Sequence, residues 1–192
     1  MPVLTMETNR LFFELFVDDL PYKRVEAKLF KRDLLLPKSF DSMDQLDFWF
    51  DQLEYKLAKN YLLFLLGKQD YLSTVLKTKL SKRLVSKKTQ EKLLENFVKL
   101  GYVDDKRVVK QLVNRYKLKK SIREIKCRLK KDGIDLESYP DIYDELLKEG
   151  EKEAIEKLVY KNRGKDKQKL KAYLFRKGFS VDAIKTLHDL DI

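Results

Sequence analysis

The sequence predicts a mainly α-helical protein of tandem three-helix repeats in an elongated, curved array, preceded by a small N-terminal β-hairpin and helix element. Three observations lead to this fold class. Apolar residues recur at spacings of three and four from Asp41 onward, which is typical of amphipathic helices. A segment with an apolar–Lys–x–x–Leu core occurs three times. Strand-like, aromatic-rich sequence is confined to the first 40 residues.

The first 40 residues predict a β-hairpin followed by a short helix. Leu11–Val17 is aromatic-rich and strand-like, a turn-forming segment follows it, and Tyr22–Val25 is predicted as the return strand. A brief helix is expected around Ala27–Leu36, because the residue before Pro37 avoids the α region. The rival interpretation of this segment is an amphipathic helix over residues 10–20.

Capping signals divide the rest of the chain into helices. The segment Ser121–Glu124 reads as a capping box, in which the serine hydroxyl accepts one backbone N–H and the glutamate reaches back to another. Glycine ends helices well because it adopts positive φ without a Cβ penalty. The expected starts are Asp41 or Ser42, Ser86, Asp104, Ser121 and Ser180, and the expected stops are Gly67, Gly101, Gly133 and Gly178.

The internal repeat is the most informative feature of the chain. Its cores are Leu76–Leu80, Ile125–Leu129 and Leu170–Leu174, whose starts are 49 and then 45 residues apart. Equivalent positions follow each core: Leu84, Gly133 and Gly178, then Val85, Ile134 and Phe179, and finally Leu93, Ile142 and Leu187. We expect each repeat to pair two helices across a tight turn, with a third helix as linker. The predicted boundaries are 1–40 for the N-terminal element and 41–104, 105–149 and 150–192 for the three repeats.

Charge is distributed unevenly along the chain, whose formal net charge is +11. Residues 61–131 carry 21 basic and 6 acidic side chains, whereas residues 132–156 carry 2 and 10. Such a basic region attracts phosphate backbones or an acidic protein surface. The acidic segment that follows argues against a protein that simply coats DNA.

Composition also indicates where the protein acts. The only cysteine, Cys127, cannot form an intrachain disulfide, which fits a reducing compartment. The longest apolar run, Tyr61–Leu66, is far shorter than the roughly 18 residues that span a bilayer, and no secretory signal is visible. We therefore expect a cytoplasmic protein that does not bind membranes. We also expect it to be a monomer.

The sequence offers little material for catalysis. His188 is the only histidine, so neither a zinc cluster nor a histidine-based triad can be assembled readily. Six dispersed glycines form no phosphate-binding motif. The acid pair Asp104–Asp105 could hold Mg²⁺ or act as acid and base, but Asp104 more simply caps a helix. We predict no catalytic residues, no metal site and no cofactor.

One segment resembles a known family. Gly101-Tyr-Val-Asp-Asp-Lys-Arg107, followed by Val113 and Arg115, is similar to the signature of the RecX family of recombination regulators. The resemblance extends over about residues 61–190 and includes the basic turn Lys119–Ile125. It departs at Leu84, where the family has glycine, at Ser121-Ile122 in place of Gly-Pro, and at Val75 and Val108.

The resemblance implies a protein that binds the RecA–DNA filament and lowers the ATPase, coprotease and strand-exchange activities of RecA. The implied partners are the RecA filament and single- or double-stranded DNA, while the acidic segment meets a basic patch on RecA. The expected contact residues are Arg107, Arg115, Lys119, Lys120, Arg123, Lys126, Arg128, Lys171, Arg176 and Lys177.

Two rival functions stay open. One is a sequence-independent DNA- or RNA-binding helical module that acts without RecA, against which the acidic segment speaks because it repels phosphate. The other is a nuclease or modifying enzyme that uses Asp104 and Asp105.

Overall fold

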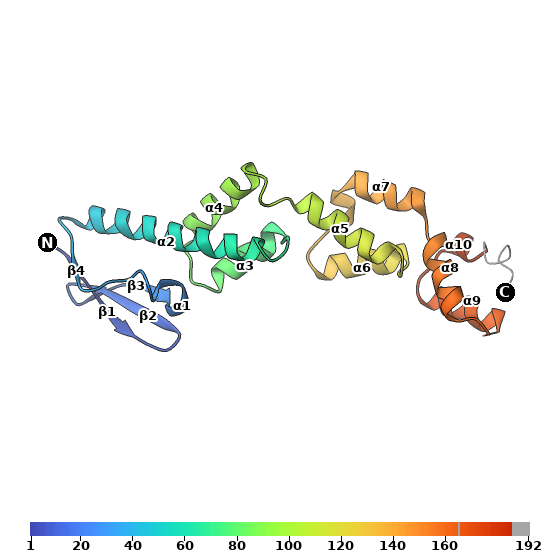
Figure 1. Ribbon diagram of the computed structural model, residues 1–192, viewed down its shortest axis with the longest axis horizontal. Coiled ribbons are helices and arrows are strands. Elements are labelled where there is room, and N and C mark those ends of the chain that lie inside the picture. Colours follow the sequence, from blue (N-terminus) through green and yellow to red (C-terminus); the bar gives the residue numbers. More distant parts are fainter. Residues whose placement is uncertain (165, 186–192) are drawn as a thin grey trace. The chain divides into compact units, whose positions relative to one another are not determined.

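The structure, a computed structural model, describes residues 1–164 and 166–185. The chain forms two compact units, Met1–Asp105 and a second that begins at Lys106 (Figure 1). A small antiparallel sheet lies at the N-terminus and helices follow it, so the mainly α fold of three-helix repeats is confirmed. The elongated, curved arrangement and the repeat boundaries stay predictions.

The N-terminal sheet is larger than the predicted hairpin. It has four antiparallel strands in the order β3-β2-β1-β4. The hairpin of β2 and β3 is confirmed, and the rival helix over residues 10–20 is wrong. The sequence prediction missed β1, whose apolar and polar residues do not alternate strictly and which fully buries only Leu4. The strands are β1 (Val3–Thr8), β2 (Phe12–Val17), β3 (Leu20–Glu26) and β4 (Lys38–Ser39).

The helix expected over Ala27–Leu36 is shorter than predicted, because α1 covers only Ala27–Phe30. After it the backbone turns, with the N–H groups of Asp33 and Leu34 both donating to the carbonyl of Phe30. This turn brings Leu34 into the core between the sheet and α2 (Met43–Leu66). In Figure 1 the long α2 runs along the sheet, and its residues Leu46, Phe50 and Leu57 complete that core.

The first repeat packs α2 against α3 (Ser73–Ser81) and α4 (Lys87–Lys99). Of the two candidate caps for α2, Ser42 makes the cap, because its hydroxyl accepts the Gln45 N–H at 3.2 Å. The cap at Ser86 is also confirmed, since its hydroxyl accepts the Thr89 N–H at 3.3 Å. These hydroxyls satisfy N–H groups that the first turn of a helix leaves without partners.

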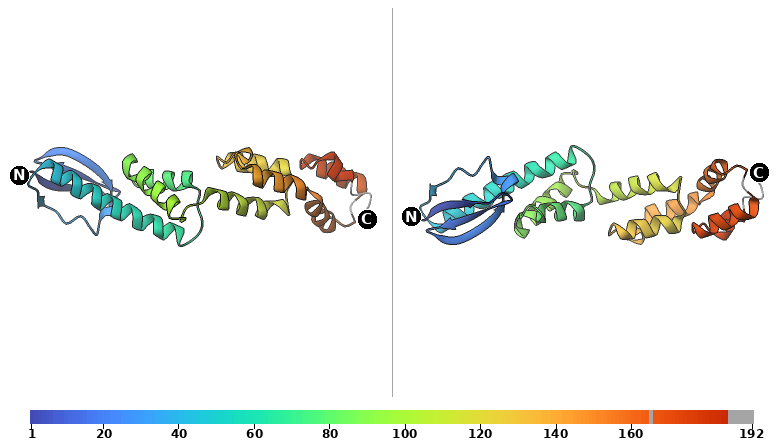
Figure 2. Two further views of the ribbon diagram at one scale, coloured as in Figure 1. Left: turned by 90° about the horizontal axis from the view of Figure 1, so that it is seen from above. Right: turned by 90° about the horizontal axis from the view of Figure 1, so that it is seen from below.

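The second unit contains the other two repeats. The second repeat has α5 (Asp105–Lys117), α6 (Ile122–Lys131), a short 3₁₀ turn η1 (Leu136–Ser138) and α7 (Pro140–Glu149). The third has α8 (Lys152–Lys161), α9 (Lys167–Arg176) and α10 (Val181–Lys185). Helix α10 contacts both α8 and α9, and the three helices lie together in Figure 2.

The internal repeat is visible in the backbone as well as in the core. All six apolar ends of the three repeat cores are at most 2% exposed. Leu84, Gly133 and Gly178 share positive φ angles of 57°, 78° and 83°. The leucine that replaces glycine therefore adopts the same left-handed turn, although its Cβ makes that conformation costly. Leu187 and His188 lie outside the described residues.

Among the described residues, no helix is both long enough and apolar enough to cross a membrane.

Candidate functional site

Helix α6 presents a basic face beside its buried face. Ile125 and Leu129 are fully buried. Arg123, Lys126 and Lys130 are spaced by three and four residues, so they share one side of the helix. A cavity of about 600 Å³ runs beside them and is closed on its other side by the segment from Ile134 to Glu137.

Lys126 is the cation of this face that contacts other side chains of its own repeat. Its ammonium donates to Glu137 Oε1 at 2.6 Å and to the Tyr143 hydroxyl at 3.4 Å, and it lies 4.9 Å from the Tyr143 ring centre. The hydrogen bond to Glu137 raises the pKa of Lys126. This lysine already binds a carboxylate of the chain, which makes it a weaker candidate for an external contact than its neighbours.

Two other expected contact residues are held by neighbouring side chains. Lys120 pairs with Glu124, so the reciprocal half of the predicted capping box is wrong: Glu124 reaches that lysine instead of the Ser121 N–H. The serine half is confirmed, with the Glu124 N–H donating to Ser121 Oγ at 3.1 Å. Arg128 lies with its guanidinium carbon 5.2 Å from the ring centre of Tyr116, on the flank toward α5.

Helix α5 divides its basic residues between two faces. Three lysines four or seven residues apart face α7 and pair with its carboxylates, and the exposed Arg107 and Arg115 lie on another side of the helix. The pairs are Lys106–Asp141 at 2.6 Å, Lys110–Glu145 at 2.9 Å and Lys117–Glu149 at 2.7 Å. Hydrogen bonds from these lysines lower the pKa of Asp141 and of Glu145.

The acidic segment 132–156 is therefore largely engaged within its own unit. Besides the α7 carboxylates, Glu137 binds Lys126, and Glu153 pairs with Lys157 at 2.9 Å. The acidic segment neutralises the side of α5 that faces α7. The side of α6 that carries Arg123 and Lys130 stays cationic and is called its outer side. This arrangement weakens the expectation that the acidic segment is available to meet a basic patch on another protein.

A buried carboxylate ties α6 to the third repeat. Glu151, 6% exposed, accepts the Ile122 N–H at the start of α6 and the Ser180 N–H before α10, each at 2.7 Å. Ser121 Oγ donates to the Lys177 carbonyl at 2.8 Å. Because negative charge is favourable at helix N-termini, one side chain stabilises two helix starts.

Two groups of expected contact residues, Arg123 on α6 and the basic residues at the end of α9, lie close together. A Cβ added at Gly178 would lie 3.2 Å from Arg123 Cδ, so the Arg123 side chain lies against the turn that ends α9. Arg176 and Lys177 are exposed next to this turn. Lys171, one and a half turns earlier on α9, instead lines a separate apolar cavity with Phe175.

Asp105, the second aspartate of the pair Asp104–Asp105, has a structural role. Asp105 accepts the Ser73 N–H at 2.7 Å and also the Ser73 hydroxyl, and so caps the start of α3. The described residues contain no group of three metal-binding side chains. The prediction that Asp104 caps the helix following it stays a prediction.

The expected contact set left out Lys130 and Lys131, and sequence reasoning did not single out Glu151. Lys130 lies seven residues after Arg123, so helical spacing alone could have placed it on the same face. Glu151 carries no comparable signal, because its two partners are 29 residues away on either side.

Comparison with known proteins gives matches to one family. Residues 144–187 match the family model described as "RecX, third three-helix domain". No curated protein sequence matches the chain. A crystal structure of a regulatory protein RecX is 17% identical, covering 99% of this chain and all of that one, with a TM-score of 0.57. A RecX structure from Lactobacillus salivarius is 23% identical, covering 71% and 95%, also with a TM-score of 0.57.

Proposed function

We infer that this chain, which belongs to the RecX family, is a regulator of the RecA recombinase. We propose further that it acts as a cytoplasmic monomer on the RecA–DNA filament and lowers the ATPase and strand-exchange activities of RecA. It has no enzymatic activity of its own in this proposal.

The observation that carries the proposal is a set of unengaged cations on the outer side of the second repeat. All three lysines of α5 pair with carboxylates of α7, whereas these side chains make no hydrogen bond or ion pair with any described residue. They extend from the end of α5 across α6, where phosphate oxygens or carboxylates of a filament could reach them. The set is Arg115, Lys119, Arg123, Lys130 and Lys131.

The expected contact set is refined accordingly. Within it, Lys120 and Lys126 support the surface through Glu124 and Glu137. Arg176 and Lys177 extend the surface across the Gly178 turn, next to Arg123. Arg107 and Arg128 border it on α5 and α6, and each is proposed as a secondary contact.

A charge-reversal experiment tests this assignment. We expect Arg123→Glu with Lys130→Glu to weaken binding to RecA filaments at least tenfold, since each reversal replaces an attraction by a repulsion. The matched control is Lys148→Glu with Lys161→Glu, which changes net charge equally at exposed lysines of α7 and α8. Filament binding is measured by anisotropy of the labelled chain, and helicity by circular dichroism.

Equal binding of the two double variants would remove the α6 surface from the proposal. Naked DNA distinguishes the rival function. A module that acts without RecA binds naked DNA as tightly as it binds the filament. Its affinity for DNA falls steeply with salt, and the α6 variant reduces that dependence. A filament regulator binds the filament much more tightly than the DNA it contains.

A further inference from the structure

Two open cavities on the outer side of α6 adjoin each other at Arg123. The first, of about 600 Å³, is the one between α6 and residues 134–137. The second, also of about 600 Å³, lies between the start of α6 and the turns before α8 and α10, and its lining includes Leu147 and Lys152. Because Ile122 and Arg123 line both cavities, the two form one groove from the second repeat to the third, which we call the α6 groove.

The α6 groove carries three cations that the chain itself does not engage. Arg123 lies where the two cavities meet, Lys130 lines the first cavity and Lys152 the second. All three are exposed and make no hydrogen bond or ion pair with any described residue. Arg123 and Lys130 are about 10 Å apart along the axis of α6, at a rise of 1.5 Å per residue. The groove therefore offers separated positive charges to an occupant.

Apolar side chains lie between these cations. Leu147 on α7 is 48% exposed, although it is a large apolar residue, and Ile122 is half-buried. Cys127, which is also exposed, lies one turn after Arg123 on the same side of α6. An occupant with an apolar side chain removes this surface from water, which favours binding.

Carboxylates line the groove as well. Asp135 and Glu137 lie across the first cavity from α6, and Glu151 and Asp182 line the second. A nucleic-acid strand carries a phosphate at every nucleotide, so it would bring phosphates against these carboxylates. A protein segment can instead place carboxylates only where the cations lie and apolar or neutral residues elsewhere. The α6 groove therefore fits a protein segment better than DNA.

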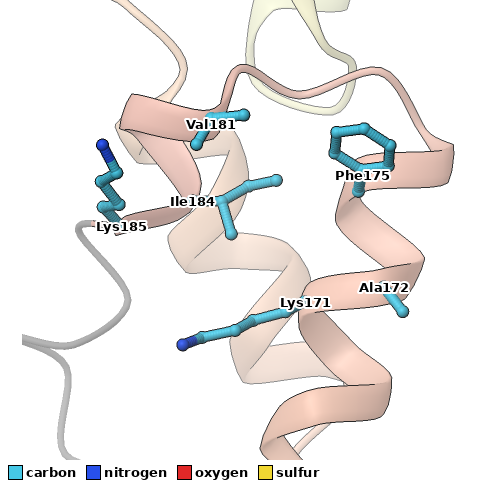
Figure 3. A pocket seen from close by; sticks show the side chains of 6 residues that line it. All are labelled: Lys171, Ala172, Phe175, Val181, Ile184 and Lys185. Atoms are coloured by element: carbon cyan, nitrogen blue, oxygen red, sulfur yellow. The ribbon is translucent and has the colours of Figure 1, made fainter.

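The cavity between α9 and α10 is separate from the α6 groove. Figure 3 shows Phe175 on α9 facing Val181 and Ile184 on α10. None of the residues that line this cavity lines the α6 groove, and its Lys185 already pairs with Asp182 at 3.1 Å. A partner that is recognised through unengaged cations and apolar side chains together is therefore assigned to the α6 groove.

We propose that the α6 groove binds an acidic segment of the RecA protein in the filament, and not the DNA of the filament. This inference rests on the proposed function and names the component of the filament that the outer side of α6 contacts. One carboxylate of the segment binds Arg123, a second binds Lys130 or Lys152, and an apolar side chain packs on Leu147. Arginine binds a carboxylate through two parallel hydrogen bonds, which fixes the register of the segment.

The accessibility of Cys127 tests which component fills the groove. It is the only cysteine of the chain and lines the first cavity, so its reaction with a small uncharged maleimide reports access to this place. The full chain is mixed with RecA filaments on single-stranded DNA or with the naked DNA, and modification of Cys127 is followed by mass spectrometry. We expect saturating filaments to slow the reaction about tenfold or more, because the covered thiol is no longer accessible, and naked DNA to leave it unchanged.

A neutral substitution gives a second readout. Leu147→Ser removes an apolar contact and no charge, so it should weaken filament binding about tenfold and leave binding to naked DNA unchanged. The matched control is Val98→Ser, at the equivalent position of the first repeat, which is 53% exposed and lies outside the groove. It should bind filaments like the native chain.

The possible failures of this inference and of the proposed function differ. A bound filament that leaves Cys127 equally reactive would overturn the inference and leave the proposed function standing. Protection of Cys127 by naked DNA would assign the groove to nucleic acid, and equal filament binding of Leu147→Ser and Val98→Ser would remove the apolar contact. A chain that does not bind filaments at all would overturn the proposed function, and this inference with it.

Discussion

The contact that can be tested most sharply is the carboxylate of Glu151 between two helix starts. Its two oxygens accept different backbone N–H groups, from Ile122 and from Ser180, each at 2.7 Å in a buried environment. In Glu151→Gln the side chain keeps its shape but has one acceptor oxygen, and its NH₂ group faces the second N–H. One buried donor then loses its partner and meets another donor.

The size of the effect follows from these two hydrogen bonds. A buried N–H left without an acceptor costs about 1–3 kcal/mol, and hydrogen bonds to charged groups lie at the upper end. We therefore expect Glu151→Gln to destabilise the second unit by about 2–3 kcal/mol. With a urea slope of roughly 1–3 kcal/mol per molar, the unfolding midpoint of that unit falls by roughly 0.7–3 M.

Two spectroscopic signals locate the effect in one unit. The only tryptophan, Trp49, packs on Phe40 in the first unit, so its fluorescence follows that unit. Circular dichroism follows the helices of both. We expect Glu151→Gln to move the dichroism transition and leave the tryptophan transition in place. The control Glu153→Gln removes only an exposed pair with Lys157, worth about 0.3–0.5 kcal/mol. If both variants have the same midpoint, Glu151 does not hold the two helices as described.

Three further outcomes follow from the turns and ion pairs. Leu84→Gly should stabilise the first unit by about 0.5–1 kcal/mol in urea unfolding, because a leucine at φ 57° is strained; destabilisation would contradict this. Gly178→Ala should destabilise more than Gly133→Ala, since only the former's Cβ meets close neighbours, and equal midpoints would refute it. Lys110 lowers the pKa of Glu145, so the pair stabilises above the unfolded pKa of about 4.3 and its contribution is lost as pH falls through the lower folded pKa. The midpoint difference between the native chain and Lys110→Ala should therefore shrink below pH 4, and a difference that grows there would contradict the assignment.

The helical part of the fold could be predicted because its signals are local. Ser42, Ser86 and Ser121 cap helices through residues three positions away, so their role is written in adjacent sequence. Strand β1 depends on pairing across β2, in a register that runs from Leu4–Val17 to Thr8–Phe13. Its own residues lack a clear alternation, and nothing local distinguishes it from a loop.

The candidate site likewise has one part that local sequence predicts and another that depends on how the helices pack. Arg123 is expected as a contact residue because the basic segment Lys119–Ile125 resembles the family's, and the structure places it on an exposed face of α6. The pairing of Lys110 with Glu145, 35 residues away, depends on how α5 and α7 pack. Charge totals along the chain could not show that the acidic segment neutralises its own neighbour, and they therefore suggested an external partner for it.

The most direct test of the proposed function is the DNA-dependent ATPase of RecA from the same organism, measured with and without this chain. DNA is in excess, the salt is physiological, and the chain is present well below the RecA concentration. Regulation of the filament predicts a lower ATPase rate at ratios too small to cover the DNA, and the Arg123→Glu, Lys130→Glu variant should lose most of that effect. An unchanged rate together with tight binding to naked DNA would contradict it and favour a nucleic-acid-binding module that acts without RecA.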